Sequence, residues 1–321
     1  MTMHFVVMGV PRSGTTATVN ALNLHPEIMC GDEYFPNVET ACAATLPSAF
    51  EDEKTYRMPN GDRTRTLFRL KKNEALIFGD KDPRYFFRLP DLNTAAPSCK
   101  KICIYRPKLG FWNSWDARAR NRDDAYWGRG QTGFFGVLEL IGLLGAIADV
   151  DSSGEVLIVN YDDLFFENPD TIHAIYDYLG AGPNSDVAAS FRKSLFSPAG
   201  VSRNQPNADA EQVYRHLQLA QLEQMILTQP VVTNVEVADI LREYCRSCRP
   251  LTMDLIDSRF PNMPMAELAY FLNAKGLRSM LGRQNIRARA QQAIEADKRS
   301  SDHLGPDLSQ LQRRFDELAT S

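Results

Sequence analysis

Short apolar runs alternate with amphipathic segments along the first 180 residues of the chain. Residues 4–9 form an apolar run that passes through a glycine-containing turn into residues 17–24, where apolar positions recur at helical spacing. The same order of strand, turn and helix recurs over residues 100–120 and again over residues 155–180. Strands that alternate with helices predict an α/β fold of three layers, in which helices cover both faces of a parallel sheet.

One apolar run is long enough to raise the question of a membrane span. It covers residues 134–150, but Glu139, Asp149 and three glycines interrupt it. Since 17 residues of this kind fall short of a bilayer-spanning helix, we expect a buried helix. The first residues show no secretory signal pattern, and six scattered cysteines are typical of a reduced compartment. We therefore expect a cytoplasmic protein without a membrane span.

Local signals place several boundaries. Pro169 is expected to open a helix that Gly180 closes. A polar segment covers residues 51–72, and its sequence PNGD at residues 59–62 predicts a turn. Residues 196–209 are rich in proline, asparagine and serine and have no periodicity, which indicates a loop or linker.

From residue 210 onward the pattern is helical, and it becomes a mixed-charge tail after residue 282. We therefore divide the chain into an α/β core, residues 1–209, and a helical C-terminal extension, residues 210–321. The extension is expected to be an acceptor lid, an oligomer surface or a partner-binding surface, and the sequence does not decide among these.

Composition narrows the class of protein. The chain has 321 residues, of which 44% are hydrophobic and 24% charged, as in a globular protein. Its 36 basic and 40 acidic side chains give a net charge of −4, so no positive field favours a nucleic acid partner. Cys245 and Cys248 form a CxxC pair without a second pair or a histidine cluster, so we expect a structural role rather than a metal site.

The first turn carries the frame of a phosphate-binding loop, GVPRSGTT at residues 9–16. Glycines let the backbone point several N–H groups inward, and the following helix adds the positive end of its dipole. In the nucleoside-triphosphate version of this loop, a lysine that reaches the β- and γ-phosphates follows the second glycine, where this chain has Thr15. The loop therefore favours a single 5′-phosphate, with Arg12 supplying charge and the hydroxyls of Thr15 and Thr16 donating hydrogen bonds.

The second unit offers another set of anion-binding side chains. Arg106 ends a strand, and Ser114 and Arg118 follow at one helical turn from each other. They share a helix face and are expected to converge with Arg106 on a dianionic phosphate. The alternative is that both arginines are solvated surface charges.

Together these segments resemble the PAPS-dependent sulfotransferases, which transfer a sulfuryl group from 3′-phosphoadenosine 5′-phosphosulfate (PAPS) to a hydroxyl or amine. The resemblance spans about residues 4–180, and local similarity is to the tyrosylprotein, Golgi and bacterial branches of the family. It rests on these segments: PRSGTT (11–16), LHPEIMCGDEYF (24–35), GDKDPRYF (79–86), Arg106 with Ser114, and VNYDDLFFENP (159–169). It implies a P-loop-NTPase-like topology, PAPS as donor, 3′-phosphoadenosine 5′-phosphate (PAP) as product, and no obligatory metal.

The resemblance also implies roles for individual residues. Glu33 matches the catalytic base, with Asp32 as the alternative, and Arg12 and Lys81 are expected to stabilise the bridging oxygen and the sulfuryl group. The donor is expected to be held by two groups of residues: Ser13, Gly14, Thr15 and Thr16 at the 5′-phosphate, and Arg106, Ser114, Arg118 and, from the late loop, Arg203 at the 3′-phosphate.

Several alternatives remain open at this point. Lys81 would otherwise pair with Asp80 or Asp82. His25 is expected to pack or cap a helix end, and Tyr161 to be a strand-end aromatic or a nucleotide contact. The competing functions are a magnesium-dependent P-loop kinase and a binding module without chemistry. The acceptor is expected to be a small molecule, a glycan or another hydroxyl compound. The C-terminal helices offer a surface for a homo-oligomer as one of their open roles.

Overall fold

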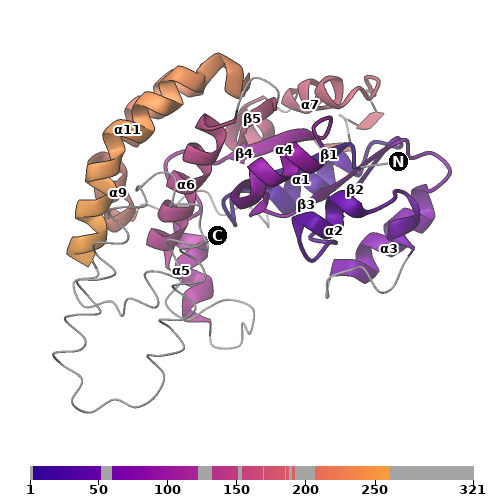
Figure 1. Cartoon of the computed structure of the whole chain (residues 1–321), viewed down its shortest axis with the longest axis horizontal. Coiled ribbons are helices and arrows are strands. Elements are labelled where there is room, and N and C mark those ends of the chain that lie inside the picture. Colours follow the sequence, from indigo (N-terminus) through magenta and orange to yellow (C-terminus); the bar gives the residue numbers. More distant parts are fainter. Residues whose placement is uncertain are drawn as a thin grey trace, which may run out of the picture.

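A computed structural model gives the structure of the chain (Figure 1). It describes residues 3–51, 60–121, 132–150, 154–168, 170–184, 186–187, 190–191 and 207–259. Within these residues, no helix is both long and apolar enough to cross a membrane.

One sheet of six strands organises the fold, in the order β2-β3-β1-β4-β5-β6. The strands are β1 (Phe5–Gly9), β2 (Ile28–Asp32), β3 (Ile77–Lys81), β4 (Lys100–Tyr105), β5 (Val156–Asn160) and β6 (Val231–Thr233). The first five are parallel, with the P-loop-like order that the sequence predicted. The sixth pairs antiparallel with β5, so the sheet differs at this edge from the purely parallel one that was predicted.

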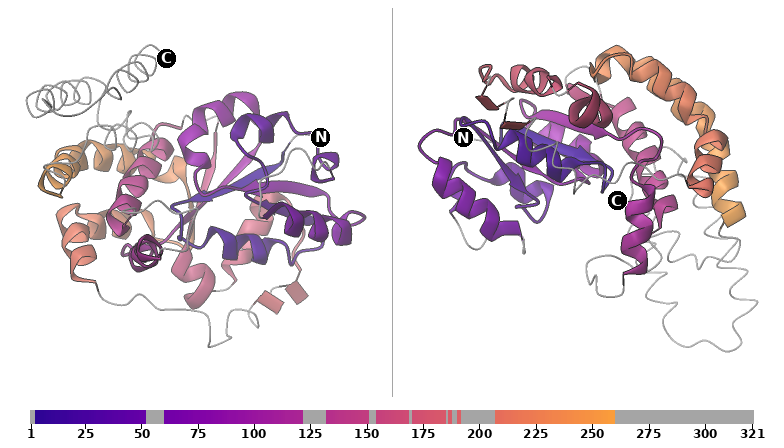
Figure 2. Two further views of the ribbon diagram at one scale, coloured as in Figure 1. Left: turned by 90° about the horizontal axis from the view of Figure 1, so that it is seen from below. Right: turned by 180° about the vertical axis from the view of Figure 1, so that it is seen from behind.

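Alternation along the strands produces a core on each side of the sheet. Val6 and Met8 of β1 belong to one apolar cluster, while Phe5 and Val7 belong to the other. The helices that cover these faces are α1 (Thr15–Leu22), α2 (Val38–Ala43), α3 (Asn60–Lys71), α4 (Leu89–Ala95), α5 (Trp112–Arg120), α6 (Gly133–Ala148) and α7 (Thr171–Leu179), with short helical turns at Ser48–Phe50, Tyr85–Arg88 and Asp163–Glu167. The three-layer α/β architecture is therefore confirmed (Figure 2).

The apolar run at residues 134–150 is the buried helix α6, as predicted. Gly180 closes α7 in a left-handed conformation with φ of 81°, also as predicted, whereas Pro169 lies outside the described residues. The turn predicted at residues 59–62 is wrong, because Asn60 begins α3 there. A helix replaces the turn because the polar segment continues for three turns and its buried Phe68 packs into the core.

The C-terminal region contributes α9 (Ala208–His216), α10 (Leu219–Ile226), β6 and α11 (Asn234–Arg259). Its buried side chains, such as Val213, Leu222 and Leu241, join the same apolar cluster as α6. Figure 1 shows α11 beside α6 at one end of the sheet. The helical pattern is thus confirmed for residues 210–259, with β6 as an addition, and these helices share a core with the α/β part. The rest of the predicted extension, including the mixed-charge tail, lies outside the described residues. Cys245 and Cys248 lie on α11 as free thiols.

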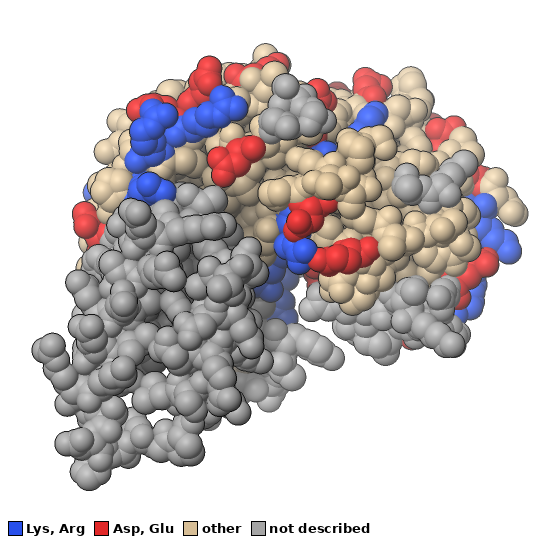
Figure 3. Space-filling view, in the orientation of Figure 1, with Lys and Arg blue, Asp and Glu red and all other residues tan. Residues whose placement is uncertain are grey.

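Charged side chains of both signs are interspersed over the described part of the face in Figure 3. No broad single-sign basic surface occupies that part of the face, which agrees with the balanced charge of the sequence.

Candidate active site

The predicted site residues collect at one edge of the sheet, where the five parallel strands end. The phosphate-binding loop follows β1, Asp32 ends β2, Lys81 ends β3, and Arg106 and Tyr161 directly follow β4 and β5. Because the carboxyl ends of parallel strands share an edge, five segments that are distant in sequence meet here. In an open α/β sheet this edge is the usual place for a ligand.

The loop after β1 has the backbone conformation that anion binding requires. Arg12 has φ of 74° and Gly14 has φ of 102°, so two left-handed residues curl the chain ahead of α1. A Cβ atom at Gly14 would lie 2.3 Å from a ring carbon of Tyr161, which only glycine avoids. Ser13 is buried, and its hydroxyl has no hydrogen-bond partner among the described residues. Such an orphaned hydroxyl in the loop fits a ligand that brings an acceptor oxygen.

The predicted 5′- and 3′-phosphate segments are held against each other. Arg12 Nε donates to Ser114 Oγ at 2.8 Å, and Arg106 Nη1 donates to the carbonyl of Arg12 at 3.0 Å. The buried indole of Trp115 donates to the carbonyl of Pro11 at 2.7 Å. The loop after β1 and the start of α5 therefore form one cationic surface, which the spacing of residues in each segment alone did not specify.

The other predicted donor-binding residues differ in exposure. Thr15 is buried at the start of α1 and Thr16 is exposed. Arg118 lies one turn after Ser114 on α5, as predicted, and is half-buried. The guanidinium of Arg106 lies 4.6 Å from the centre of the Tyr161 ring. Arg203 falls outside the described residues.

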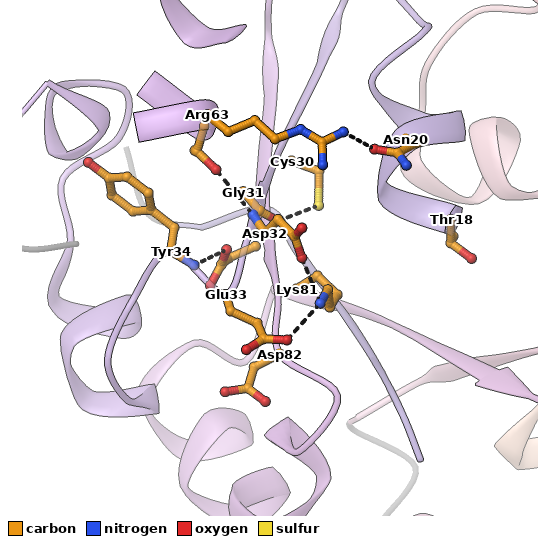
Figure 4. Close-up of polar contacts among 12 residues, drawn as sticks. Thr18, Asn20, Cys30, Gly31, Asp32, Glu33, Tyr34, Arg63, Lys81 and Asp82 are labelled. Carbon is orange, nitrogen blue, oxygen red and sulfur yellow. Dashed lines mark hydrogen bonds and ion pairs between the residues drawn. The ribbon is translucent and has the colours of Figure 1, made fainter. Parts of the chain in front are cut away.

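Lys81 joins the two candidate bases. Its Nζ lies 2.6 Å from Asp32 Oδ1 and 2.9 Å from Glu33 Oε1. Figure 4 draws both contacts as dashed lines. Asp32 and Lys81 face each other in the β2–β3 register, which brings the partner from the neighbouring strand. The predicted alternative of a pair with Asp80 or Asp82 therefore gives way to these two carboxylates. Burial lowers the pKa of Lys81, but the Coulombic and hydrogen-bonding effects of the carboxylates outweigh it and raise the pKa, so Lys81 stays protonated.

Asp32 and Glu33 differ in their access to an acceptor. The side chain of Asp32 is 11% exposed and that of Glu33 is 32% exposed, while Lys81 is buried. A carboxylate that removes a proton from a bound acceptor must reach the surface of the site. Exposure therefore favours Glu33, the residue that the resemblance implied.

The Glu33 turn is strained and is held from both sides. Glu33 has φ of 53°, and its N–H donates to the carbonyl of Lys81 at 2.6 Å. The N–H groups of Tyr34 and Phe35 donate to the Asp80 carboxylate at 3.1 and 3.4 Å. Asp80 and Lys81, adjacent on β3, thus hold the backbone of this turn. Lys81 also holds the side chain of the candidate base, a contact that Figure 4 draws.

Asp80 is a residue that sequence reasoning missed as part of the site. It is fully buried and accepts a third hydrogen bond from the hydroxyl of Tyr85 at 2.6 Å. Burial raises its pKa to about 7 although its hydrogen bonds act in the opposite direction. A Cβ at Gly31 would lie 2.4 Å from Asp80 Oδ1, which accounts for that glycine. The only sequence signal was the carboxylate directly before Lys81.

A second missed feature is the ion pair between Arg84 and Glu139. Glu139 is fully buried in α6, and Arg84 Nη2 lies 3.0 Å from its Oε1. Burial lowers the pKa of Arg84, but the carboxylates of Glu139, Asp82 and Glu33 outweigh this effect, and the net pKa is raised. Arg84 is therefore a fixed cation near the candidate base. An acidic residue in the middle of the apolar run was the available sequence signal.

His25 has the packing role that was favoured. It is buried, its Nε2 lies 2.9 Å from the carbonyl of Gly182, and its ring centre lies 4.8 Å from that of Tyr176. Both contacts are at the opposite end of α1 from the phosphate-binding loop. His25 is therefore a structural residue.

The loop after β1, with its left-handed backbone and its buried serine hydroxyl, has the form of a phosphate-binding loop at the carboxyl edge of an α/β sheet. A family model described as "Sulfotransferase family" matches residues 5–182, which is more than half of the chain. The protein therefore belongs to the sulfotransferase family and is an enzyme of that class. No curated protein matches the sequence.

Several solved structures resemble the fold at low sequence identity. The sulfotransferase domain from the curacin biosynthetic pathway is 13% identical over 68% of this chain and 98% of that one, with a TM-score of 0.41. Sulfotransferase STF1 from Mycobacterium tuberculosis H37Rv is 17% identical over 67% and 76%, also with a TM-score of 0.41. Mouse sulfotransferase SULT7A1, solved in complex with PAP, is 14% identical over 76% and 89%, with a TM-score of 0.42. Family membership rests on the family model.

Proposed function

We propose that this sulfotransferase takes the sulfuryl group of PAPS and transfers it to a hydroxyl or amine of an acceptor, leaving PAP. One observation carries the proposal: Arg12, inside the phosphate-binding loop, is hydrogen-bonded to Ser114 and held through its carbonyl by Arg106. Two phosphate-binding segments joined in this way suit a nucleotide that carries phosphates on both its 5′ and its 3′ oxygens.

The donor's 5′-phosphate would lie in the loop. The hydroxyl of Ser13, the hydroxyls of Thr15 and Thr16, and the N–H groups around Gly14 are the donors that the chain offers there. Arg106, Ser114 and Arg118 would bind the 3′-phosphate, with Arg203 as a further contact. Tyr161, which contacts the Arg106 guanidinium, would border the nucleoside.

The transfer itself is an in-line displacement. Glu33 accepts the acceptor's proton while the acceptor oxygen forms a bond to sulfur, and the bond from sulfur to the 5′-phosphate oxygen breaks. The electron pair of that bond stays on the phosphate oxygen, where Lys81 and Arg12 stabilise the developing charge. This assignment requires no metal ion, because the chain's own cations lie at the site.

The magnesium-dependent kinase alternative has less support. Thr15 stands where such a loop has the lysine that reaches the β- and γ-phosphates. Location in the cytoplasm and self-association through the C-terminal helices remain predictions from the sequence.

Calorimetric titration tests the donor class directly. PAP in buffer with EDTA is compared with ADP in buffer with Mg²⁺. Tight binding of PAP without metal is expected, since both phosphates meet cationic side chains. Preference for ADP with Mg²⁺ would overturn the proposal. Once the donor is established, an acceptor screen with PAPS over phenols, sugars, amines and glycans identifies the substrate.

A further inference from the structure

A buried carboxylate from the C-terminal region contacts the turn between β4 and α5, next to the proposed 3′-phosphate residues. Glu223 of α10 is 8% exposed. It accepts hydrogen bonds from the hydroxyl of Tyr105 at 3.0 Å, from the hydroxyl of Tyr214, and from the backbone N–H of Lys108 at 3.0 and 3.3 Å to its two oxygens.

The backbone that Glu223 holds is strained. Lys108 and Leu109 have φ of 54° and 50°, two consecutive non-glycine residues in the left-handed region. They form the turn between β4 and α5, and this turn sets how Arg106, at the strand end, faces Ser114, on the helix. A conformation that such side chains disfavour persists only where its surroundings fix it.

The contacts at this turn come from α10 and from Asn207, the residue directly before α9. Besides the hydrogen bond from Lys108 N–H to Glu223, Asn207 Nδ2 donates to Asn113 Oδ1 at 2.9 Å, one residue before Ser114. Leu109 is buried in the cluster that contains Leu219 and Leu222 of α10. The segment that carries the proposed 3′-phosphate residues is thus held by contacts with α10 and with the start of α9.

We propose that Glu223 is a positioning residue for donor selectivity: it fixes the Lys108–Leu109 turn so that Arg106 and Ser114 meet Arg12 in the geometry that distinguishes a 3′-phosphorylated nucleotide. The inference rests on the proposed function. It also assigns a role to the C-terminal region, as a scaffold for the donor site.

The chemistry of Glu223 explains why a carboxylate stands there. Its three partners are all donors, and an ionised carboxylate is a side chain that only accepts. Glutamine keeps one acceptor oxygen for the Lys108 N–H, and its amide can donate to a tyrosine hydroxyl. Methionine has a similar length but no oxygen. The pair therefore separates loss of the hydrogen bond from loss of volume.

The test measures binding of PAP and of adenosine 5′-phosphate, which lacks the 3′-phosphate, to the wild type and to Glu223→Met, Glu223→Gln and Glu243→Met. Glu243 is an exposed glutamate of α11 and serves as the matched control. We expect Glu223→Met to reduce the preference for PAP by about tenfold or more, the size of a lost charged hydrogen bond, with little change for adenosine 5′-phosphate. Glu223→Gln should restore most of the preference, and Glu243→Met should leave it unchanged.

The ratio of the two affinities does not depend on the fraction of folded protein, so a merely destabilised variant leaves it unchanged. An unchanged ratio in Glu223→Met overturns the inference, whether both affinities stay the same or both fall by the same factor. If Glu223→Met does not fold, Tyr214→Phe removes one donor to Glu223 and should lower the ratio about two- to threefold, whereas no change overturns the inference. A wild type without preference for PAP would instead overturn the proposed function itself.

Discussion

Two strained turns lie at the same edge of the sheet, and a buried carboxylate holds each of them, in each case from a different part of the chain. The turn after β2 places Glu33 in a left-handed conformation, and the turn after β4 does the same to Lys108 and Leu109. Each is held by a buried carboxylate: Asp80 accepts two backbone N–H groups and one tyrosine hydroxyl, and Glu223 accepts one backbone N–H and two tyrosine hydroxyls.

The difference lies in the origin of the carboxylate. Asp80 comes from β3, the strand beside β2, so the turn with the candidate base is complete within the α/β core. Glu223 lies 115 residues after Lys108, in the C-terminal region. The comparison therefore predicts that changes at the first turn affect proton transfer from the acceptor, whereas changes at the second affect selection of the donor.

The largest expected effect separates these two functions. Glu33→Gln removes the proposed base but keeps the size of the side chain, so turnover should fall by about 10² or more while the affinity for PAP stays near that of the wild type. Initial rates with PAPS and calorimetry with PAP measure the two quantities. Glu27→Gln is a matched control at the amino-terminal end of β2. Full turnover in Glu33→Gln contradicts the assignment, and loss of PAP binding contradicts the separation of the two turns.

A somewhat smaller effect is expected at the donor side. Arg106→Ala should weaken PAP binding by about 1.5 to 3 kcal/mol, as for a lost charged hydrogen bond, and should weaken adenosine 5′-phosphate binding much less. Calorimetry with both nucleotides measures this selectivity. Arg246→Ala, which removes an exposed arginine of α11, provides the control. Equal weakening of both nucleotides would mean that Arg106 does not bind the 3′-phosphate.

The Asp80 carboxylate should make the first turn sensitive to pH. Its folded-state pKa of about 7 lies above the ordinary value of 3.8, so the folded state holds this proton more tightly than the unfolded state. Stability from Asp80 is therefore present at low pH and is lost as pH rises from about 4 to about 7. Asp80→Asn resembles the protonated form and lacks this loss.

Denaturant unfolding of the wild type and of Asp80→Asn at pH 5 and pH 8 measures the effect. We expect the difference in unfolding free energy to shift in favour of the variant by about 1 kcal/mol or more between these pH values, since one unit of pKa shift corresponds to about 1.4 kcal/mol. Other titrating groups contribute equally to both proteins and cancel. A difference that is independent of pH would show that Asp80 is ionised in the folded protein throughout this range.

Local patterns in the sequence predicted much of the fold and the segments that meet at the candidate site. The alternation of strands and helices, the loop at residues 9–16 and the spacing of Arg106 and Ser114 each depend on neighbouring residues, and the structure has these elements where they were expected. The family model supports the resemblance on which the class of enzyme was predicted.

Contacts between distant segments could not be predicted in this way. The partners of Lys81 follow from the β2–β3 register, and β6 has only three residues, too few for a recognisable period. Asp80 looked like one of several polar residues in GDKDPR, and Glu223 like one acidic residue of a helix. Their roles come from burial beside strained turns, which no local pattern records.

The smallest expected effects come from one substitution made at both turns. Tyr85→Phe removes a hydroxyl donor from Asp80, and Tyr214→Phe removes one from Glu223. Each lost hydrogen bond should cost about 0.5 kcal/mol, that is, a change of about two- to threefold. We expect Tyr85→Phe to lower turnover with unchanged preference for PAP, and Tyr214→Phe to lower that preference with little effect on turnover at saturating donor. Steady-state rates and competition between PAP and adenosine 5′-phosphate measure both. If the two variants changed the same quantity, the turns would act as one unit, because the carboxylates would then be coupled through the joined Arg12, Ser114 and Arg106 surface.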